Sequence, residues 1–181
     1  MFKPEETALL VIDVQKKFCA PGVLRGTQKT DAMARKIARL APAFRKAGIK
    51  IYALRIAGNP HFDNGNDYDF HRYFPTEEDT EIIKTSDSGF EDTNLDDVLK
   101  IDGKKNLLVC GFNLCACVYS TAADGVARGF KVSVILDLSG NDRVCGGDGG
   151  LLYNFLKPLE NQGVEIATTK KVFQALRTAH K

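Results

Sequence analysis

The 181-residue sequence has almost no excess charge of either sign and no long apolar run. Its 25 Lys and Arg residues against 23 Asp and Glu residues give a formal net charge of +2. This balance does not indicate a surface for nucleic acid or for anionic lipid. Every apolar run is far shorter than the roughly 20 residues that a transmembrane helix needs, so we expect no association with a membrane.

The start of the sequence lacks the features of a secretory signal. "MFKPEETALLVIDV" places an acidic pair before its apolar run, without a basic start or a small-residue cleavage site. We therefore expect a cytoplasmic protein. Because cytosolic thiols are usually reduced, a disulfide framework is not expected. The cysteine count of five is also odd, which leaves at least one thiol unpaired.

The sequence also lacks repeats, low-complexity segments and interdomain linkers, and its length fits one domain spanning 1–181. Short runs that are apolar on both faces recur along it, which is typical of parallel strands covered by helices on each side. These predicted strands are 7–14, 50–54, 81–84, 106–112, 131–136 and 164–168.

Segments between these runs have helical periodicity, at 28–47, 95–99, 114–128, 148–162 and 170–179. In the first of them, Pro42 is expected to kink the helix or to divide it. The alternation of strands and helices predicts an α/β fold. We expect a three-layer α/β/α sandwich with a mainly parallel, Rossmann-like doubly wound sheet of about six strands. The long irregular stretch 56–79 is predicted to be a lid or binding loop.

Reactive side chains are expected where the predicted strands end. Asp13 and Lys84 end two of them, and a cysteine-rich stretch, "CGFNLCACV" (110–118), follows a third. In open α/β sheets, ligands bind beyond the carboxyl ends of the strands. A carboxylate, an amine and a thiol at this edge suit nucleophilic catalysis, because the carboxylate can move a proton and the cation favours the thiolate.

The residues themselves do not decide which cysteine would attack. Cys110 lies in an apolar strand and should be buried. Cys115 and Cys117 are predicted in the first turn of the next helix, where free N–H groups lower a thiol pKa. They point about 200° apart around that helix, and spacing alone favours neither.

Three motifs taken together resemble the isochorismatase-like cysteine hydrolases, a superfamily that includes nicotinamidases and N-carbamoylsarcosine amidase. The motifs are "LLVIDVQKKF" (9–18), "IIKTSDSGFEDTNLDDVL" (82–99) and "LLVCGFNLCACVYSTAADGVARGFKVSVILD" (107–137), and "QGVEIATTKKVFQAL" (162–176) also fits. They cover nearly the whole chain in the order that the family has them.

The resemblance implies a catalytic triad of Asp13, Lys84 and Cys117. It also implies a cis peptide bond between Phe112 and Asn113, with the backbone N–H groups of Asn113 and Cys117 as an oxyanion hole. The implied reaction is hydrolysis of a C–N bond in a small amide or ureido substrate through a thioester on Cys117. It implies no cofactor, and it implies a homo-oligomer.

The sequence departs from the family at two positions near this site. Leu114 replaces the family's threonine, and Cys115 replaces a frequent aspartate. With Phe18, Leu114 is a candidate wall of the substrate pocket. Members that cleave a vinyl ether typically lack the cysteine, so Cys117 favours the amidase branch.

No metal site is predicted. The stretch "RIAGNPHFD" (55–63) lacks the Asp-x-His by which similar nicotinamidases bind a metal. His61 and His71 are therefore interpreted as polar loop residues.

Two other functions remain open from the sequence. One is a non-catalytic binding or assembly protein that kept the fold. The other is a thiol-redox protein using Cys115 and Cys117. Under the leading hypothesis, Cys110 and Cys115 are packing residues, and Cys19 and Cys145 lie in loop-like stretches with no partner motif.

Overall fold

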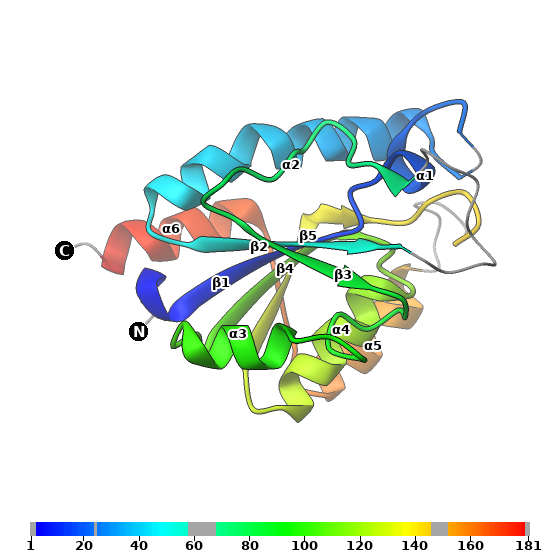
Figure 1. The fold of residues 1–181 in the computed structure, drawn as a ribbon. Coiled ribbons are helices and arrows are strands. Elements are labelled where there is room, and N and C mark those ends of the chain that lie inside the picture. The colour runs from blue at the N-terminus through cyan, green and yellow to red at the C-terminus, as the bar shows by residue number, and fades with distance from the viewer. Residues whose placement is uncertain (1–2, 24, 58–67, 146–151, 180–181) are drawn as a thin grey trace.

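The computed structural model describes residues 3–23, 25–57, 68–145 and 152–179. Within these ranges one sheet of parallel strands has the order β3-β2-β1-β4-β5-β6. The strands are β1 (Thr7–Ile12), β2 (Lys50–Ile56), β3 (Thr80–Lys84), β4 (Asn106–Phe112), β5 (Lys131–Gly140) and β6 (Glu165–Ala167). Helices cover both faces of this sheet (Figure 1). The predicted strands and the predicted three-layer α/β/α sandwich are therefore confirmed.

Each face of the sheet has its own apolar core, because successive side chains of a strand point to opposite faces. In β1, Leu9 and Val11 pack into one core, and Ala8, Leu10 and Ile12 pack into the other. The helices α2 (Gln28–Lys46) and α6 (Thr169–Ala179) cover the first face. The second face is covered by α3 (Leu95–Ile101), α4 (Cys117–Ala127) and α5 (Leu152–Asn161).

The helix α2 is continuous through Pro42, so the expectation that this proline divides the helix is wrong. Pro42 is exposed, while Ile37, Ala41 and Phe44 continue the buried stripe on the other side. The packing of that stripe offsets the hydrogen bond that proline cannot donate. A capping box between Thr27 and Thr30 starts the helix.

Two short helices were not predicted, η1 (Pro4–Glu6) and α1 (Lys16–Cys19). The helix α4 begins at Cys117 rather than at 114, because residues 114–116 form a turn. Cys115 therefore lies before the helix and not in its first turn. The predicted start of the fourth helix, at 148, lies outside the described residues.

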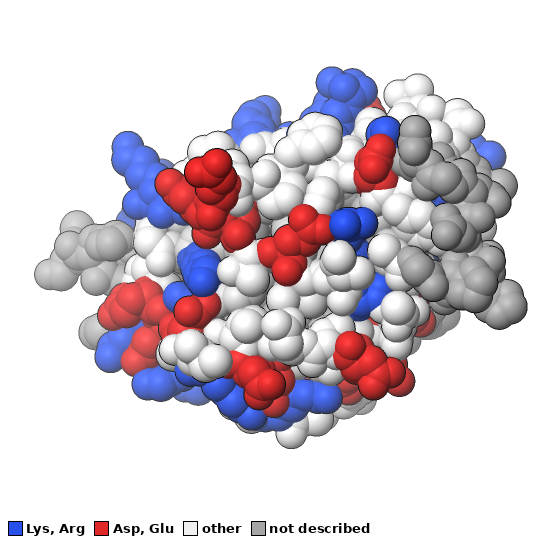
Figure 2. Space-filling view, viewed as in Figure 1, with Lys and Arg blue, Asp and Glu red and all other residues white. Residues whose placement is uncertain are grey.

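The carboxyl ends of the strands gather at one edge of the sheet, at the right of Figure 1, and both chain termini lie at the other side. On the face that Figure 2 shows, acidic and basic side chains are interspersed, in line with the near-neutral net charge. Among the described helices, none has both the length and the apolar character to cross a membrane.

Candidate active site

Asp13 follows β1 directly and is fully buried at the carboxyl edge of the sheet. Its φ of +50° lies in the left-handed region, which aspartate tolerates better than most residues. The backbone N–H of Asp13 donates to the carbonyl of Leu54, and the Oδ1 atom of Asp13 accepts from the N–H of Ile56 at 3.0 Å. These bonds to β2 hold the carboxylate at the strand ends.

Lys84 is the last residue of β3 and is also buried. Its Nζ atom lies 2.9 Å from Oδ2 of Asp13 and donates to the carbonyl of Ser86 at 3.0 Å. Because β2 lies between β1 and β3, the lysine side chain reaches across the end of β2 to meet the carboxylate.

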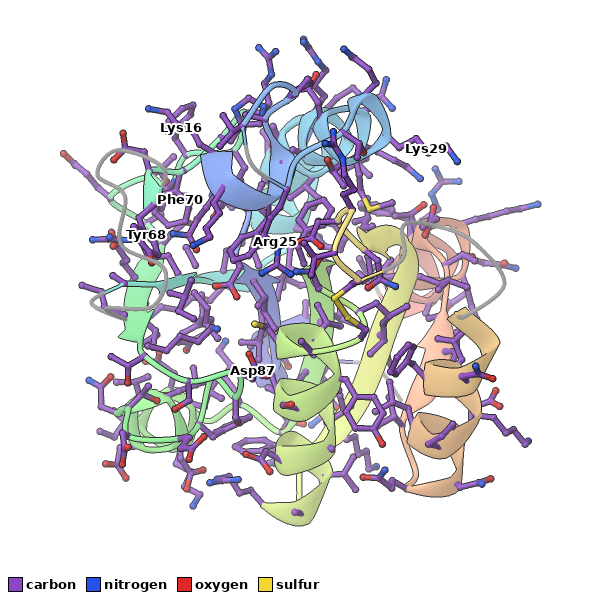
Figure 3. The ribbon with its side chains drawn as sticks, turned by 90° about the vertical axis from the view of Figure 1, so that its right-hand side faces the viewer. Lys16, Arg25, Lys29, Tyr68, Phe70 and Asp87 are labelled. Carbon is purple, nitrogen blue, oxygen red and sulfur yellow. A yellow bond between two sulfur atoms is a disulfide. The ribbon has the colours of Figure 1, made fainter. Side chains whose placement is uncertain are left out.

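Cys117 opens α4 and is 4% exposed. Its thiol interacts with both the carboxylate of Asp13 and the ammonium of Lys84. Its Sγ atom also donates a hydrogen bond to Oδ1 of Asp87 at 3.5 Å. The three side chains that the sequence singled out thus lie together at the carboxyl edge, the edge that Figure 3 views from the front.

Charge and burial shift the pKa of all three groups. Burial raises the pKa of the Asp13 carboxyl above its ordinary value, and the Lys84 charge only partly opposes this. Burial lowers the pKa of the Lys84 ammonium, but the charges of Asp13 and Cys117 outweigh it, so the pKa is raised. Burial and the Asp13 charge raise the pKa of the Cys117 thiol. The sequence-based expectation of a lowered thiol pKa is therefore wrong for the resting protein, because desolvation outweighs the nearby cation.

The turn that leads into α4 contains a cis peptide bond between Phe112 and Asn113. The preceding Gly111 has a φ of +118°, and a Cβ atom there would lie 2.0 Å from the carbonyl oxygen of Ile12. Only glycine fits so close to β1.

The backbone N–H groups around this turn differ in their hydrogen bonding. Those of Leu114, Cys115 and Ala116 donate to Gly140, Asn141 and Asn113. Between described residues, no hydrogen bond outside the helices and the sheet ladder uses the N–H of Asn113 or Cys117 as donor. These are the two N–H groups that the family resemblance assigns to an oxyanion hole.

A buried aspartate that the sequence reasoning missed fixes this turn. Asn113 and Asp142 form a reciprocal pair, in which the amide of Asn113 donates to Oδ2 of Asp142 at 2.9 Å and the N–H of Asp142 donates to Oδ1 of Asn113 at 2.7 Å. Arg25 forms an ion pair with Asp142 at 2.5 Å, and its guanidinium lies over the ring of Phe18. The polar run "SGND" (139–142) at the end of β5 is the only sequence signal that could have indicated this role.

A disulfide bond joins Cys115 to Cys145, which corrects the prediction that Cys115 is a packing residue with a free thiol. It is a single bond rather than a framework, and Cys19, Cys110 and Cys117 are free. The redox hypothesis also needs revision, since Cys115 is bonded to Cys145 while Cys117 is free. The bond, with the Asn113–Asp142 pair, links the segment 141–145 to the turn before α4.

Other motif residues support the strand ends. Gln15 is fully buried, donates to the carbonyls of Ile56 and Tyr68, and accepts from the N–H of Ile56. In the loop after β3, Thr93 donates to the carbonyl of Gly89 at 2.6 Å. These contacts assign the polar residues Gln15 and Thr93 of the first two motifs to the scaffold.

The two candidate pocket residues lie in different places. Phe18, in α1, is buried beneath Arg25. Leu114 is fully buried in the same apolar core as Cys117, which accounts for an apolar side chain at this position.

The loop predicted at 56–79 is described only in part. Tyr68, Phe70 and Tyr73 are buried, and Phe70 pairs with Gln15 in an isolated β-bridge. Tyr68 and Phe70 lie on the side of the site away from Asp87 (Figure 3). Tyr68 and Phe70 therefore pack beside Gln15 at the carboxyl edge, whereas Tyr73 donates to Asp79 just before the start of β3.

Of the two loop histidines, the structure describes only His71. His71 lies 2.6 Å from Oδ1 of Asp31 on α2, where it holds the loop to that helix. His61 lies outside the described residues. Among the residues that the structure describes, no three His, Cys, Asp or Glu side chains are grouped to hold a metal ion.

Comparison with known proteins identifies the family. The isochorismatase domain model matches residues 7–171. The chain belongs to the isochorismatase family. Two relatives are a secreted isochorismatase effector from Verticillium dahliae (30% identical, 82% of this chain and 80% of that protein) and a streptothricin hydrolase from Streptomyces noursei (33% identical, 69% of this chain and 50% of that protein). A cysteine hydrolase from Pseudomonas syringae pv. phaseolicola has a similar structure, with a TM-score of 0.85 and 26% identity over 98% of this chain and 95% of that one.

Family membership makes the protein an isochorismatase-like hydrolase with the expected Rossmann-like fold. One of the relatives is named as a secreted protein.

Proposed function

We propose that this isochorismatase-family protein is a cysteine hydrolase that cleaves a C–N bond in a small amide or ureido compound, with Cys117 as nucleophile. The observation that carries the proposal is the contact of the Cys117 thiol with a buried carboxylate–ammonium pair, Asp13 and Lys84. The names of two relatives, a streptothricin hydrolase and a cysteine hydrolase, support the same class of chemistry.

In the first half of the reaction, the ionised carboxylate of Asp13 accepts the thiol proton as the Cys117 sulfur attacks the carbonyl carbon. The negative charge that forms on the carbonyl oxygen is stabilised by the N–H groups of Asn113 and Cys117. Asp13 then gives the proton to the departing nitrogen, the C–N bond breaks, and ammonia or an amine leaves. The acyl group remains on Cys117 as a thioester.

In the second half, Asp13 accepts a proton from water as that water attacks the thioester carbonyl. The C–S bond breaks, the proton returns to the sulfur, and the acid product leaves. Lys84 keeps its positive charge throughout, because its pKa is raised by Asp13 and Cys117 despite its burial. That charge offsets the negative charge of the carboxylate and of the developing thiolate. Burial of all three groups strengthens these interactions by excluding water.

The raised thiol pKa supports general-base catalysis by Asp13 over attack by a preformed thiolate. A thiol whose pKa lies above its ordinary value is protonated at neutral pH. Proton transfer must therefore accompany attack, and Asp13 is the buried carboxylate that interacts with the thiol, whereas Asp87 is exposed.

A panel of small primary amides and ureido compounds, scored by ammonia release, tests the proposal. The Cys117→Ser variant should lose at least about a thousandfold in kcat/KM, since serine is a far weaker nucleophile without the thiol's polarisability. The matched control is Cys110→Ala, which removes a buried thiol from β4 on the opposite face of the sheet. Equal turnover by wild type and Cys117→Ser would contradict the proposal.

We also propose that the protein forms homo-oligomers, as the family resemblance implies. Ile83 on the edge strand β3 is 54% exposed and Phe74 is 63% exposed, so both large apolar side chains are available to an interface. Sedimentation equilibrium of wild type and of Ile83→Glu tests this: the variant should have the lower mass, and a monomeric wild type would contradict the proposal.

A further inference from the structure

Asp87 brings a carboxylate to the nucleophile from the solvent side. Its Oδ1 atom accepts the hydrogen bond of the Cys117 thiol at 3.5 Å. Asp87 is exposed, whereas Cys117 is only 4% exposed. In Figure 3, Asp87 lies beside the end of α4 that faces the carboxyl edge. Asp87 is therefore a solvent-exposed carboxylate in direct contact with the buried sulfur.

The backbone on both sides of Asp87 is held in place. The carbonyl of Ser86 accepts from Lys84 at 3.0 Å, and the hydroxyl of Ser88 donates to Asp124 on α4 at 2.6 Å. The N–H of Gly89 donates to the hydroxyl of Thr121 at 2.8 Å. Because its neighbours are fixed to β3 and α4, the position of Asp87 relative to Cys117 is set by the scaffold.

The charge of Asp87 is not balanced by a cation of the site. Lys84 is paired with Asp13, and Arg25 is paired with Asp142. Asp87 forms no ion pair with any residue in the described ranges. The segments 58–67 and 146–151 contain no Lys or Arg in their sequence. The two cations of the site, Lys84 and Arg25, are each paired with one carboxylate. The third carboxylate, Asp87, therefore leaves one excess negative charge next to the sulfur.

We propose that Asp87 is a specificity-determining residue that selects amides with a cationic nitrogen, such as an ammonium or amidinium group, on the carbon next to the scissile carbonyl or one atom further. This inference rests on the proposed function and names its substrate class. In an attack-ready complex the carbonyl carbon lies about 3–3.5 Å from the sulfur. A substituent on the adjacent carbon then comes within hydrogen-bonding reach of Asp87, whose Oδ1 lies 3.5 Å from the same sulfur.

Such a cation would also assist the thiol. Burial and the charge of Asp13 are the main causes of the raised pKa of Cys117, and the charge of Asp87 adds to them. A cationic group bound by Asp87 removes this last contribution, so proton loss from Cys117 becomes easier when the substrate is in place. A substrate with a carboxylate at the same position would be repelled.

The first test measures the charge preference at the sulfur without any substrate. Wild-type protein is treated at neutral pH and low salt with 2-aminoethyl methanethiosulfonate, which is cationic, or with 2-sulfonatoethyl methanethiosulfonate, which is anionic. Each reagent forms a disulfide with the thiol and releases methanesulfinate. Peptide mass mapping gives the rate at Cys117, with Cys117→Ser as background. The ratio of the two rates is the readout, because a change in thiol pKa affects both rates alike and cancels.

We expect the cationic reagent to react at least about tenfold faster with the wild type. The ratio should fall about tenfold in Asp87→Asn and remain high in Asp87→Glu. Asp92→Asn, which removes the same charge from an exposed residue of the same loop, should leave it unchanged. A ratio that is the same in Asp87→Asn and wild type would overturn the proposal. Resistance of Cys117 to both reagents would also overturn it, because small molecules would then not reach the sulfur beside Asp87.

The second test uses three small primary amides whose substituent next to the carbonyl carries a cation, no charge or an anion: glycinamide, propionamide and malonamate. For the wild type, kcat/KM from ammonia release should be highest for glycinamide and lowest for malonamate, with at least about tenfold between glycinamide and propionamide. Asp87→Asn should bring the ratio of kcat/KM for glycinamide to kcat/KM for propionamide close to one, whereas Asp92→Asn should keep the wild-type ratio. An equal loss on all three amides would assign Asp87 to the chemical step and overturn the proposal.

Failure of the specificity proposal is distinct from failure of the proposed function. If the wild type hydrolyses propionamide and glycinamide equally well and Cys117→Ser hydrolyses neither, the hydrolase stands and the selection by Asp87 is wrong. If no amide or ureido compound is hydrolysed but the reagent ratio depends on Asp87, the hydrolase is wrong and the charge preference of the sulfur stands as the property of a binding site.

Discussion

The Nζ atom of Lys84 lies 2.9 Å from Oδ2 of Asp13, although the two residues end strands that are not neighbours in the sheet. Both side chains are fully buried. Removal of one partner from such a pair leaves an uncompensated charge in the protein interior. The pair is therefore required for the fold of the carboxyl edge as well as for the proposed reaction.

Replacement of Lys84 by alanine should lower the free energy of unfolding by about 3–5 kcal/mol, because Asp13 would remain buried without its cation. Urea denaturation followed by circular dichroism measures this change. Lys100→Ala is the matched control, since Lys100 forms an exposed pair with Asp96 at 2.8 Å and its loss should cost no more than about 1 kcal/mol. Equal urea midpoints for Lys84→Ala and Lys100→Ala would show that the buried pair contributes no more to the free energy of unfolding than a surface pair does.

The pH dependence of kcat/KM should reflect Asp13 on the acid side. Asp13 must be ionised to accept the thiol proton, so activity falls as the pH falls through its pKa. Because burial raises that pKa, the acid limb should lie above the ordinary value of 3.8. The pKa of Lys84 is raised from 10.5 by Asp13 and Cys117, which outweigh its burial, so loss of its charge should not reduce activity below that pH.

We would measure kcat/KM from acid to alkaline pH, with circular dichroism at each pH to exclude unfolding. These rates check both the acid limb assigned to Asp13 and the alkaline limit assigned to Lys84. An acid limb at or below 3.8 would contradict the role of Asp13. A tenfold rise in rate per pH unit through the neutral range would indicate attack by a free thiolate instead.

Asp142 is expected to position the oxyanion hole through Asn113. The Asp142→Asn variant keeps the size of the side chain but replaces one acceptor oxygen with a donor, and so breaks the pairing with Asn113 or Arg25. We expect kcat to fall about tenfold to a hundredfold with little change in KM, because the turn then holds the N–H groups less accurately.

Steady-state kinetics with separate kcat and KM values measure this effect. The control is Asp102→Asn, which alters a carboxylate bonded to Lys50 and Tyr52 at the other edge of the sheet. If Asp142→Asn changes only the stability, or changes KM alone, its assignment as a positioning residue is wrong.

The Cys115–Cys145 disulfide should stabilise the protein by about 3–4 kcal/mol, since it closes a loop of 30 residues in the unfolded chain. The double variant Cys115→Ser/Cys145→Ser should therefore unfold at lower urea concentration than oxidised wild type. Dithiothreitol should lower the midpoint of the wild type to that of the double variant and leave the double variant unchanged. A wild type that does not respond to the reductant would mean that the bond does not stabilise the fold.

The sequence predicts the sheet well, because the central strands β1, β2 and β4 are runs that are apolar on both faces. The outer strands β3 and β6 are shorter and partly exposed. Helix ends are predicted less well. The start of α4 is predicted three residues early because Leu114 and Ala116 continue the apolar character of the helix. In the structure, residues 114–116 form a turn whose N–H groups donate to Gly140, Asn141 and Asn113. Local propensity does not contain that constraint.

Some residues of the candidate site could be predicted from the sequence and others could not. Asp13, Lys84 and Cys117 could be singled out because each ends a strand or follows one and fits a family motif. Asp142 and Cys145 could not, because their partners Asn113 and Cys115 lie 29 and 30 residues away and only the folded chain brings them together. The raised thiol pKa was missed for a related reason: burial of Cys117 depends on contacts from both β4 and α4 that no local pattern describes.

The central claim is that Cys117 carries the acyl group, and trapping of that intermediate tests it most directly. The protein is mixed with p-nitrophenyl acetate, quenched in acid within the first turnover, and digested for peptide mass mapping. The account predicts a burst of one nitrophenolate per chain and an acetyl group on Cys117, both lost in Cys117→Ser and slowed in Asp13→Asn. Acetylation of another residue at the burst rate, or a burst that survives in Cys117→Ser, would contradict it.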